Sequence, residues 1–234
     1  MEEFKANPGK NLTIELDGQK YARLPLQTKV VTKDDTILAI STAYAQPFLK
    51  PGDFLFISEK IVAISQGRAF PIKEIKPSFL AKFLVTYVYK SPHGIGLGSP
   101  WTMELAIREA GAVRILFAAF CSAVTKPFGI RGVFYKVAGH RINAIDGPTP
   151  YTLPPYNEYA KLPPAKPEKV ASELAQALGH DVVIIDANDL GVNVLGKSNA
   201  AIEDSFCQKV FKDNPLGQTT ERTPLCIVRR VDVK

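Results

Sequence analysis

Residues 167–186 read PEKVASELAQALGHDVVIID, and this stretch indicates the class of fold. Pro167 suits the first position of a helix, where its missing N–H is no loss, and Gly179 is typical of the residue after a helix. The apolar run over residues 182–185 is typical of a buried strand. A helix followed by a buried strand predicts an α/β arrangement, in which ligands bind just beyond the strand ends.

Oxygen-bearing side chains follow this predicted strand, in a segment over residues 186–199 that we expect to be a polar loop. Asp186, Asn188 and Asp189 lie at its start. Carboxylates just beyond a strand end are suited to bind a metal ion or the groups around a phosphate. The alternative is that Asp186 and Asp189 cap a following helix. We favour the ligand role because the strand-end position and the clustered carboxylates coincide.

The rest of the chain indicates a mixed α+β fold, and its 234 residues are enough for one large domain or two small ones. We expect one domain over residues 1–234, with a possible subdivision near residues 80–100. Ser99, Pro100 and Gly111 mark the start and stop of the clearest helix. The other predicted elements are an extended segment over residues 20–31, a helix over 34–45, strands over 54–58, 115–120, 134–138 and 225–228, an extended or helical piece over 60–65, and an irregular loop over 147–167.

Two glycine-containing loops are candidate ligand sites. Gly94 and Gly96 precede the helix that begins at Pro100, and a helix N-terminus favours phosphate or carboxylate. A flexible loop without a ligand explains these glycines equally well. Asp146 precedes Gly147 and a proline, where a carboxylate can bind a hard cation such as Mg²⁺. Taken alone, an aspartate before Gly-Pro is more often part of a plain turn.

Two cationic side chains stand beside these segments. Lys60 follows the strand predicted over residues 54–58, and Arg141 lies shortly before Asp146. Most lysines and arginines at such positions are solvated. Either can instead reach a phosphate or a substrate carboxylate, so both join the candidate site.

Composition places the chain among ordinary globular proteins. Of its 234 residues, 46% are hydrophobic and 22% charged, and no apolar run is long enough to span a bilayer. The acidic N-terminus does not resemble a signal peptide, and the three cysteines lie far apart, so we expect a cytoplasmic protein with reduced thiols. Its net charge of +6 is spread along the chain, which suits an anionic small ligand and makes nucleic acid a minor option.

A series of short motifs follows in order: Leu24-Pro25-Leu26, Lys50-Pro51-Gly52-Asp53, Lys60-Ile61-Val62, Gly67-Arg68, Ala138-Gly139 and Ile184-Ile185-Asp186. No single motif is specific. Their order and spacing, over about residues 24–196, resemble those of the coenzyme F(420)-0:L-glutamate ligase family. By this resemblance, Asp186 is the leading metal ligand, and Lys60 and the segment from Leu24 to Leu26 lie near a nucleotide.

The resemblance implies a ligase that uses GTP, or ATP, and a divalent metal, Mg²⁺ or Mn²⁺. Such an enzyme forms a γ-glutamyl amide bond between L-glutamate and a carboxylate-bearing cofactor. The resemblance also implies mixed sheets with flanking helices and an intertwined homodimer. In the resulting hypothesis the catalytic residues are Asp186, Asp146 and Arg141, the metal ligands are Asp146, Asp186 and Asp189, and the nucleotide contacts are Leu24, Pro25, Leu26, Lys60, Gly94, Gly96 and Asn188.

The chain departs from the family pattern at several positions. Arg141 stands where the family has its first metal-binding aspartate, and Ala144 where it has an asparagine. Ala187, Leu190 and Ile64 replace a threonine, an arginine and a second lysine. These departures keep two alternatives open: a non-catalytic nucleotide- or anion-binding protein on the same scaffold, and a ligase that acts on a folate-like or peptide-like acceptor.

Overall fold

The computed structural model describes residues 4–88, 95–130, 132–188, 191–217 and 219–231. The chain divides into two compact units. The first unit consists of Met1–Gly67 and Pro164–Lys234, and the second of Arg68–Pro163. The single ligase-like domain expected from the sequence stays a prediction.

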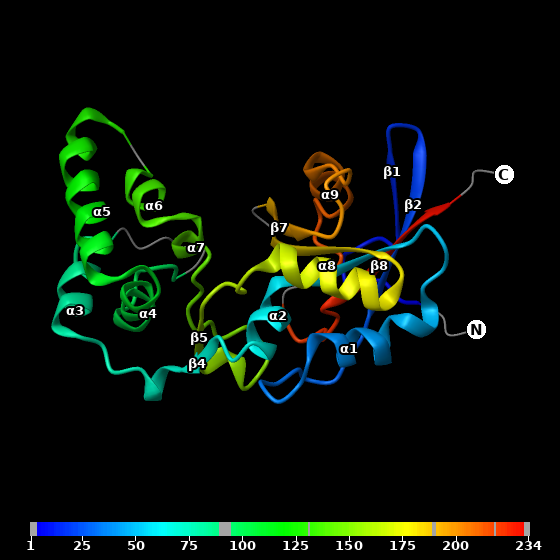
Figure 1. Ribbon diagram of the computed structural model, residues 1–234, viewed down its shortest axis with the longest axis horizontal. Coiled ribbons are helices and arrows are strands. Elements are labelled where there is room, and N and C mark those ends of the chain that lie inside the picture. The colour runs from blue at the N-terminus through cyan, green and yellow to red at the C-terminus, as the bar shows by residue number, and fades with distance from the viewer. Residues whose placement is uncertain (1–3, 89–94, 131, 189–190, 218, 232–234) are drawn as a thin grey trace. The chain divides into compact units, whose positions relative to one another are not determined.

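A six-stranded sheet forms the centre of the first unit (Figure 1). Its neighbouring strands are antiparallel, except for one parallel pair, β3 with β6. In spatial order the strands are β1 (Thr13–Leu16), β2 (Gln19–Leu26), β8 (Leu225–Val231), β3 (Phe54–Ser58), β6 (Asp181–Asn188) and β7 (Gly191–Lys197). This mixed sheet with its helices confirms the fold class expected from the sequence.

Helices pack on the central strands of this sheet and explain why those strands are apolar on both faces. Phe56 of β3 stacks on Phe211 at a ring separation of 4.5 Å, in a core that includes residues of α9. The helix α8 packs against β6 and β7. The helical segments of this unit are α1 (Ile37–Tyr44), η1 (Gln46–Phe48), α2 (Glu59–Ser65), α8 (Pro167–Leu178) and α9 (Asp204–Val210).

The second unit is mainly helical and has its own core, which includes Met103, Leu105, Ile115 and Ile142. Its helices are α3 (Phe79–Val85), α4 (Pro100–Ala110), α5 (Ala112–Thr125), α6 (Val133–Ala138) and α7 (His140–Asn143), with short turns η2 (Ile72–Glu74), η3 (Lys126–Phe128) and η4 (Tyr156–Glu158). A two-stranded sheet of β4 (Ala69–Pro71) and β5 (Tyr159–Lys161) completes the unit.

Two of the predicted strands are helices. The apolar run over residues 115–120 lies inside α5, and residues 134–138 lie inside α6. A short apolar run cannot be assigned to helix or strand by periodicity alone. In α5 the run is continuous because one side of the helix, with Ile115 and Ala118, is buried, while the opposite side is also apolar but exposed.

The polar loop predicted over residues 186–199 is wrong as well. Asp186 and Asn188 belong to β6, which pairs with β7 as a hairpin. Asp186 is paired with Asn193, and Asn188 with Gly191. Asparagine and aspartate are rare in strands, which hid this pairing. The irregular loop predicted over residues 147–167 likewise contains η4 and the strand β5.

The elements with clear end signals are confirmed. The strand β3 spans the predicted residues 54–58, and α8 begins at Pro167 and is followed by Gly179 in the left-handed conformation. Ser99 caps α4 by accepting a hydrogen bond from the Thr102 N–H, and Gly111 follows the helix. These signals are local, so they can be recognised without knowledge of the tertiary structure.

Candidate functional site

The strands of the first unit are aligned at one edge of the sheet. Leu26 of β2 pairs with Leu225 of β8, which pairs with Ile57 of β3, and Ile57 pairs with Ile184 of β6. One row of residues therefore crosses four strands. With about 4.8 Å between neighbouring strands, the row spans about 14 Å. Residues that directly follow this row toward the edge therefore lie near one another on the first unit.

Asp186 lies at this edge. The parallel ladder between β3 and β6 ends at Ser58 and Ile185, so Asp186 is the first residue of β6 beyond it. Its side chain is half-buried, as is that of Asn188. Mg²⁺ is commonly held by one or two carboxylates together with phosphate oxygens and water, so an accessible carboxylate here fits a metal. Asp189, the other carboxylate predicted in this segment, lies outside the described residues.

Lys60 lies at the same edge of the sheet. The helix α2 follows β3 without a loop, and Lys60 is its second residue, exposed to solvent. The turn is held by the Ser58 N–H, which donates to the Pro224 carbonyl oxygen at 2.8 Å. The lysine and Asp186 thus extend from two neighbouring strands, although far apart in sequence.

A groove of about 690 Å³ lies beside the end of β2, within the size range of small-molecule sites. Pro25 and Leu26 line it, whereas Leu24 is not among its lining residues. Its other walls are formed by Phe4, Lys5, Ala6, Asn7, Gln27, Ala43, Tyr44, Phe48, Glu221 and Thr223. This mixture of aromatic, polar and charged side chains suits a ligand with a flat ring and polar groups.

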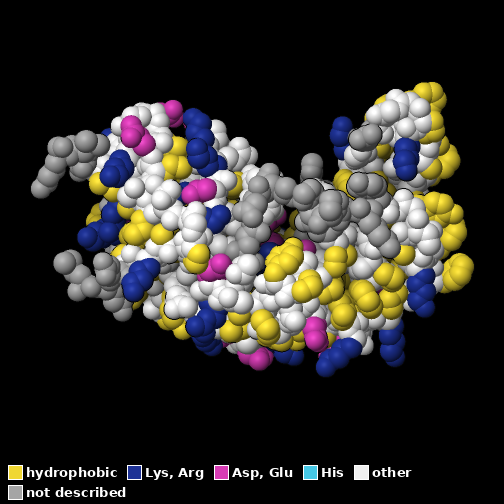
Figure 2. Space-filling view, turned by 180° about the vertical axis from the view of Figure 1, so that it is seen from behind, with side chains coloured by type: hydrophobic (Ala, Val, Ile, Leu, Met, Phe, Trp, Pro, Cys, Tyr) yellow, Lys and Arg dark blue, Asp and Glu magenta, His cyan; other side chains and the backbone are white. Residues whose placement is uncertain are grey.

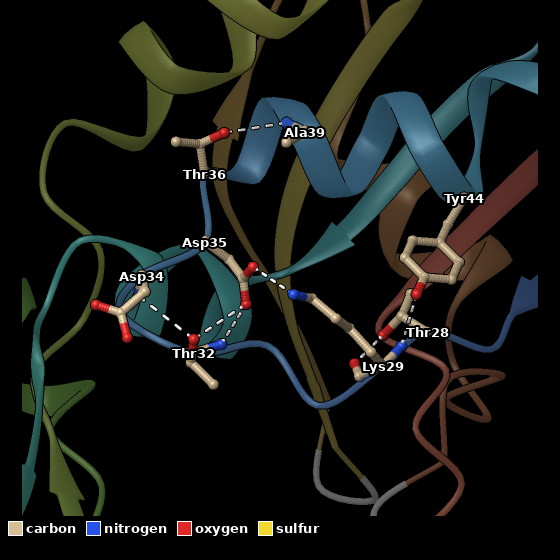
Figure 3. Close-up of polar contacts among 8 residues, drawn as sticks. All are labelled: Thr28, Lys29, Thr32, Asp34, Asp35, Thr36, Ala39 and Tyr44. Carbon is tan, nitrogen blue, oxygen red and sulfur yellow. Dashed lines mark hydrogen bonds and ion pairs between the residues drawn. The ribbon is translucent and has the colours of Figure 1, made fainter.

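The segment between β2 and α1 is held by a set of polar contacts (Figure 3), and it adjoins the groove through Gln27 and through Tyr44 of α1. Asp35 accepts hydrogen bonds from the N–H and hydroxyl of Thr32, and its Oδ1 lies 2.6 Å from Lys29 Nζ. The Lys29 N–H donates to the Tyr44 hydroxyl oxygen at 3.3 Å. The hydrogen bond from Lys29 lowers the pKa of Asp35, and the same bond raises the pKa of Lys29. Sequence reasoning missed this segment because its residues match no motif.

The second unit brings together two candidates from distant parts of the chain. Gly147 lies so close to Ile95 that a Cβ on Gly147 would be 2.8 Å from the Ile95 Cβ. The loop with Gly96 therefore packs beside the turn that contains Asp146. Gly96 has φ +46°, a conformation that favours glycine. Gly94, the other predicted glycine, lies outside the described residues.

Asp146 has a buried lysine as its neighbour. Its backbone N–H and carbonyl oxygen both pair with Lys161, at 3.0 Å and 2.8 Å. The Asp146 Oδ2 also lies 3.6 Å from Lys161 Nζ, and Lys161 is buried. An ammonium group beside a carboxylate supplies part of the positive charge that a metal ion would bring. Among the described residues, no group of three or more His, Cys, Asp or Glu is arranged to hold a metal ion.

A sequence profile described as F420-0:Gamma-glutamyl ligase matches residues 25–205, which include the whole second unit and, at the sheet edge, the ends of β2, β3 and β6. The chain belongs to the F(420)-0:γ-glutamyl ligase family. The match confirms the resemblance drawn from the short motifs. No curated protein sequence matches the chain. Along the described part of the chain, no helix has the length and apolar character needed to cross a membrane.

Arg141, a predicted site residue of this F(420)-0:γ-glutamyl ligase family member, is held by an ion pair. Its guanidinium lies 2.8 Å from Glu109 Oε1, and the Arg68 guanidinium contacts the same oxygen at 3.0 Å. Arg68 also donates from Nε to the Pro163 carbonyl oxygen. A single glutamate thus joins two arginines, one of which belongs to the Gly67-Arg68 motif shared with the family. Sequence analysis missed Glu109 because this residue belongs to no motif and lies near the end of α4, where a glutamate is ordinary.

The candidates of this family member therefore fall into two groups. Lys60, Asp186, Asn188 and the Leu24–Leu26 segment belong to the first unit, while Gly96, Asp146 and Arg141 belong to the second. Within the first unit the sheet register aligns its candidates along one edge. Within the second, packing brings Gly96 beside Asp146.

Proposed function

We propose that this protein is a nucleotide- and metal-dependent ligase that joins L-glutamate to a carboxylate of a cofactor acceptor. The family match over residues 25–205 carries the proposal. The shared sheet edge of Lys60 and Asp186, with the neighbouring groove, supports it. In this proposal the nucleotide is GTP or ATP, and the metal is Mg²⁺ or Mn²⁺. The enzyme acts in the cytoplasm as a homodimer.

The reaction needs activation of the acceptor, because a carboxylate does not condense with an amine in water. In the first step the bond between the γ-phosphorus and the bridging oxygen breaks, and an acceptor carboxylate oxygen bonds to that phosphorus. The products are a nucleoside diphosphate and an acyl phosphate. In the second step the glutamate amine attacks the acyl carbon and loses a proton, inorganic phosphate leaves, and the amide remains.

The chain's own residues contribute alignment and charge in this scheme. Asp186, with Asn188 and Asp189 in support, would hold a divalent ion that neutralises phosphate charge. Lys60 binds a phosphate of the nucleotide, whose ring and sugar lie in the groove beside Pro25 and Leu26. Arg141, anchored by Glu109, binds a substrate carboxylate. Catalysis of this kind depends mainly on positioning and electrostatic stabilisation.

Incubation of the protein with F(420)-0, labelled glutamate, Mg²⁺ or Mn²⁺, and GTP or ATP tests the proposal. We expect a product heavier by one glutamyl residue, formed only with nucleotide and metal. Asp186→Asn should lower kcat by at least about 100-fold. Asp181→Asn changes a carboxylate at the opposite end of β6, where it accepts a hydrogen bond from Ser198, and should keep the activity. Folate-like and peptide-like acceptors, assayed in parallel, identify the acceptor class.

The contact between Asp146 and Lys161 favours a second candidate, a protein that binds nucleotide without catalysis. A lysine beside the second predicted metal carboxylate neutralises its charge, so this position attracts a metal ion less strongly and nucleotide binding would not depend on a metal there. Thermal unfolding distinguishes the two functions, because a ligand that binds the folded state raises its melting temperature. Stabilisation by nucleotide only with Mg²⁺ or Mn²⁺ supports the ligase. Stabilisation without metal, together with no glutamyl transfer, would assign the binding function.

A further inference from the structure

The groove beside the end of β2 is lined by two different parts of the chain. Half of its lining residues, among them Pro25, Leu26 and Tyr44, belong to the range 25–205 that matches the family. The other half lies outside that range and consists of Phe4, Lys5, Ala6, Asn7, Glu221 and Thr223. A ligand in the groove would therefore touch residues to which the family match assigns no role.

Asn7 holds the N-terminal part of this wall in place. Its side chain is buried, and its Nδ2 donates to the Pro215 carbonyl oxygen and to the Thr223 hydroxyl oxygen, both at 2.8 Å. The Thr223 hydroxyl donates in turn to the Leu216 carbonyl oxygen at 2.7 Å. Buried hydrogen bonds of this kind fix a segment, because breaking them leaves polar atoms without partners. Residues 4–6 thus directly precede an anchored position and have a defined place at the groove.

Phe4 and Lys5 bring an aromatic ring and a cation to the groove. The Phe4 ring packs edge-on against Phe48 of η1, at a centroid separation of 5.4 Å and an interplanar angle of 81°. Lys5 is exposed, and among the described residues no ion pair holds its ammonium group. A nucleotide offers the complementary groups, which are a flat base that packs on aromatic rings and the oxygen and nitrogen acceptors for an ammonium group.

The charge of the first unit makes each cation near the groove important. Met1–Gly67 and Pro164–Lys234 together contain 17 Lys and Arg against 18 Asp and Glu, so this unit has no excess of positive charge. Figure 2 shows its Lys and Arg side chains spread over the face in view rather than gathered in one patch. The unit as a whole therefore does not attract an anionic ligand, and binding depends on lysines that are placed within reach of it.

We infer that Phe4 and Lys5 bind the nucleotide of the proposed reaction. The Phe4 ring packs against the base, and the Lys5 ammonium group donates to an oxygen or nitrogen acceptor of the same molecule. Asn7 is a positioning residue, because it fixes the segment that carries both. The inference rests on the proposed function, which places the base and sugar of the nucleotide in this groove. It adds that the affinity for nucleotide is set in part by residues outside the family match.

Trace acetylation of lysines on the full chain, read by mass spectrometry of peptides, tests the occupancy of the groove. The probe is GTP or ATP with Mg²⁺ at about ten times its Kd, at which about nine-tenths of the chains hold the ligand. We expect the labelling of Lys5 to fall about tenfold. Lys169 of α8, whose side chain is 65% exposed, is the control and should be labelled equally with and without nucleotide.

Lys60 separates this inference from the proposed function, which gives that lysine a phosphate contact. Protection of Lys60 without protection of Lys5 would overturn the inference and leave the proposed function standing. Protection of neither lysine would overturn both the inference and nucleotide binding at the candidate site. Protection of both, with Lys169 unchanged, supports the inference.

Removal of the two side chains supplies a kinetic test. Phe4→Ala and Lys5→Ala should each raise the KM for the nucleotide about 10-fold and leave kcat nearly unchanged, because contacts with the base are the same in the ground and transition states. Lys169→Ala should change neither constant. Lys5 is exposed, so Lys5→Ala should keep the melting temperature of the wild type. An unchanged KM in both groove variants would contradict the inference.

The positioning role of Asn7 has its own readout. Asn7→Ala should remove the protection of Lys5 by nucleotide while Lys60 stays protected, because the anchored segment is released and the phosphate contact is not. Thr223→Val removes one of the two acceptors of the Asn7 amide and keeps the shape of the side chain, so it should weaken the protection of Lys5 in a protein that still folds. Full protection of Lys5 in both variants, with a lower melting temperature, would overturn the positioning role.

Discussion

Ser58 and Ile185 form the last rung of the parallel ladder between β3 and β6. Directly beyond this rung, β3 is followed by α2, which contains Lys60, and the next residue of β6 is Asp186. Segments more than a hundred residues apart in sequence thus begin from one position on the sheet. Parallel strands align their carboxyl ends, so Lys60 and Asp186 lie at the same edge of the sheet, as their proposed contacts with phosphate and metal require.

Replacement of Lys60 tests the role of this edge. Lys60→Ala should raise the KM for the nucleotide about 10-fold with a smaller change in kcat, because a phosphate contact present in both ground and transition states is lost. Steady-state kinetics with varied nucleotide measure the effect. Lys50 lies just before the opposite end of β3, and Lys50→Ala should leave both constants unchanged. Equal effects of the two substitutions would indicate that only the overall positive charge matters.

The buried Asp53 makes Arg229 a stability determinant of the first unit. Asp53 is 1% exposed and accepts two hydrogen bonds from the Arg229 guanidinium, at 2.9 Å and 2.7 Å. The bond with Asp53 raises the pKa of Arg229. Among the described residues, the Lys50 N–H is the other hydrogen-bond donor to Asp53. Arg229→Met would therefore leave a buried carboxylate with a single donor, and we expect a loss of about 3 kcal/mol in unfolding free energy.

Its neighbour Arg230 provides the matched control. Arg230 is exposed and donates a hydrogen bond to the side chain of the partly exposed Gln19, so Arg230→Met should cost less than about 0.5 kcal/mol. Urea unfolding followed by circular dichroism measures both variants. Similar losses would mean that the β8 arginines act through strand pairing rather than through Asp53.

Asp213 gives the first unit a defined pH dependence. Partial burial opposes its ionisation, but the hydrogen bonds and charge of the buried Arg23 outweigh burial and lower the pKa of Asp213. A group with a lowered folded-state pKa stabilises the fold above its unfolded pKa, about 3.9, and loses that contribution as the pH falls through its folded value.

Asp213→Asn should therefore cost about 2 kcal/mol at pH 7, because Asp213 is about one-third exposed and its contribution is partly screened. The difference from wild type should persist down to about pH 5 and close below about pH 4. Urea unfolding at each pH measures it. Asp17→Asn, which removes an exposed partner of Lys209, should have little effect at any pH. A gap that widens in acid would contradict the assignment to Asp213.

Gly196 should tolerate no side chain. A Cβ there would lie 2.4 Å from the Pro167 carbonyl carbon and 2.6 Å from the Glu168 nitrogen, both backbone atoms at the start of α8. Gly196→Ala should cost about 3 kcal/mol because the helix must move away from β7. At Gly147 the nearest atoms are the Ile95 Cβ and Cγ2, both at 2.8 Å. Rotation of the Ile95 side chain does not move its Cβ, so the loop backbone must shift, and Gly147→Ala should cost about 2 kcal/mol, less than Gly196→Ala because the contact is longer. Thermal unfolding compares them, and the reverse order would contradict this reasoning.

The sequence predicted those elements whose ends carry their own signals. Pro167 with Gly179 and Ser99 with Gly111 bound helices that the structure contains. The prediction failed where the surroundings of a segment in the folded protein, rather than its own end signals, decide between helix and strand. Residues 115–120 belong to a helix whose two sides are both apolar and differ only in burial. A hydrophobic pattern contains no information on burial, so it could not distinguish this helix from a buried strand.

The candidate site was predictable only in part, for a related reason. Asp186 and Lys60 stand beside apolar strands, which made them visible in the sequence, and the sheet register aligns them. Lys161 and Glu109, the ionic partners of Asp146 and Arg141, carry no local signal. A side chain's partner across the fold is a consequence of tertiary structure, so neither ion pair could be recognised from spacing.

The division of the chain also has a consequence for synthesis on the ribosome. The second unit is one continuous segment, whereas β3 of the first unit pairs with β6 and with β8, which lies near the C-terminus. The helical segment can therefore complete its core while the sheet still lacks its central partners. Gln66 and Ala165 exchange hydrogen bonds of 3.0 Å and 2.7 Å where the chain leaves and re-enters the first unit. This clasp closes only after translation has passed the helical insertion, so the sheet edge with Lys60 and Asp186 is assembled after the second unit has been synthesised.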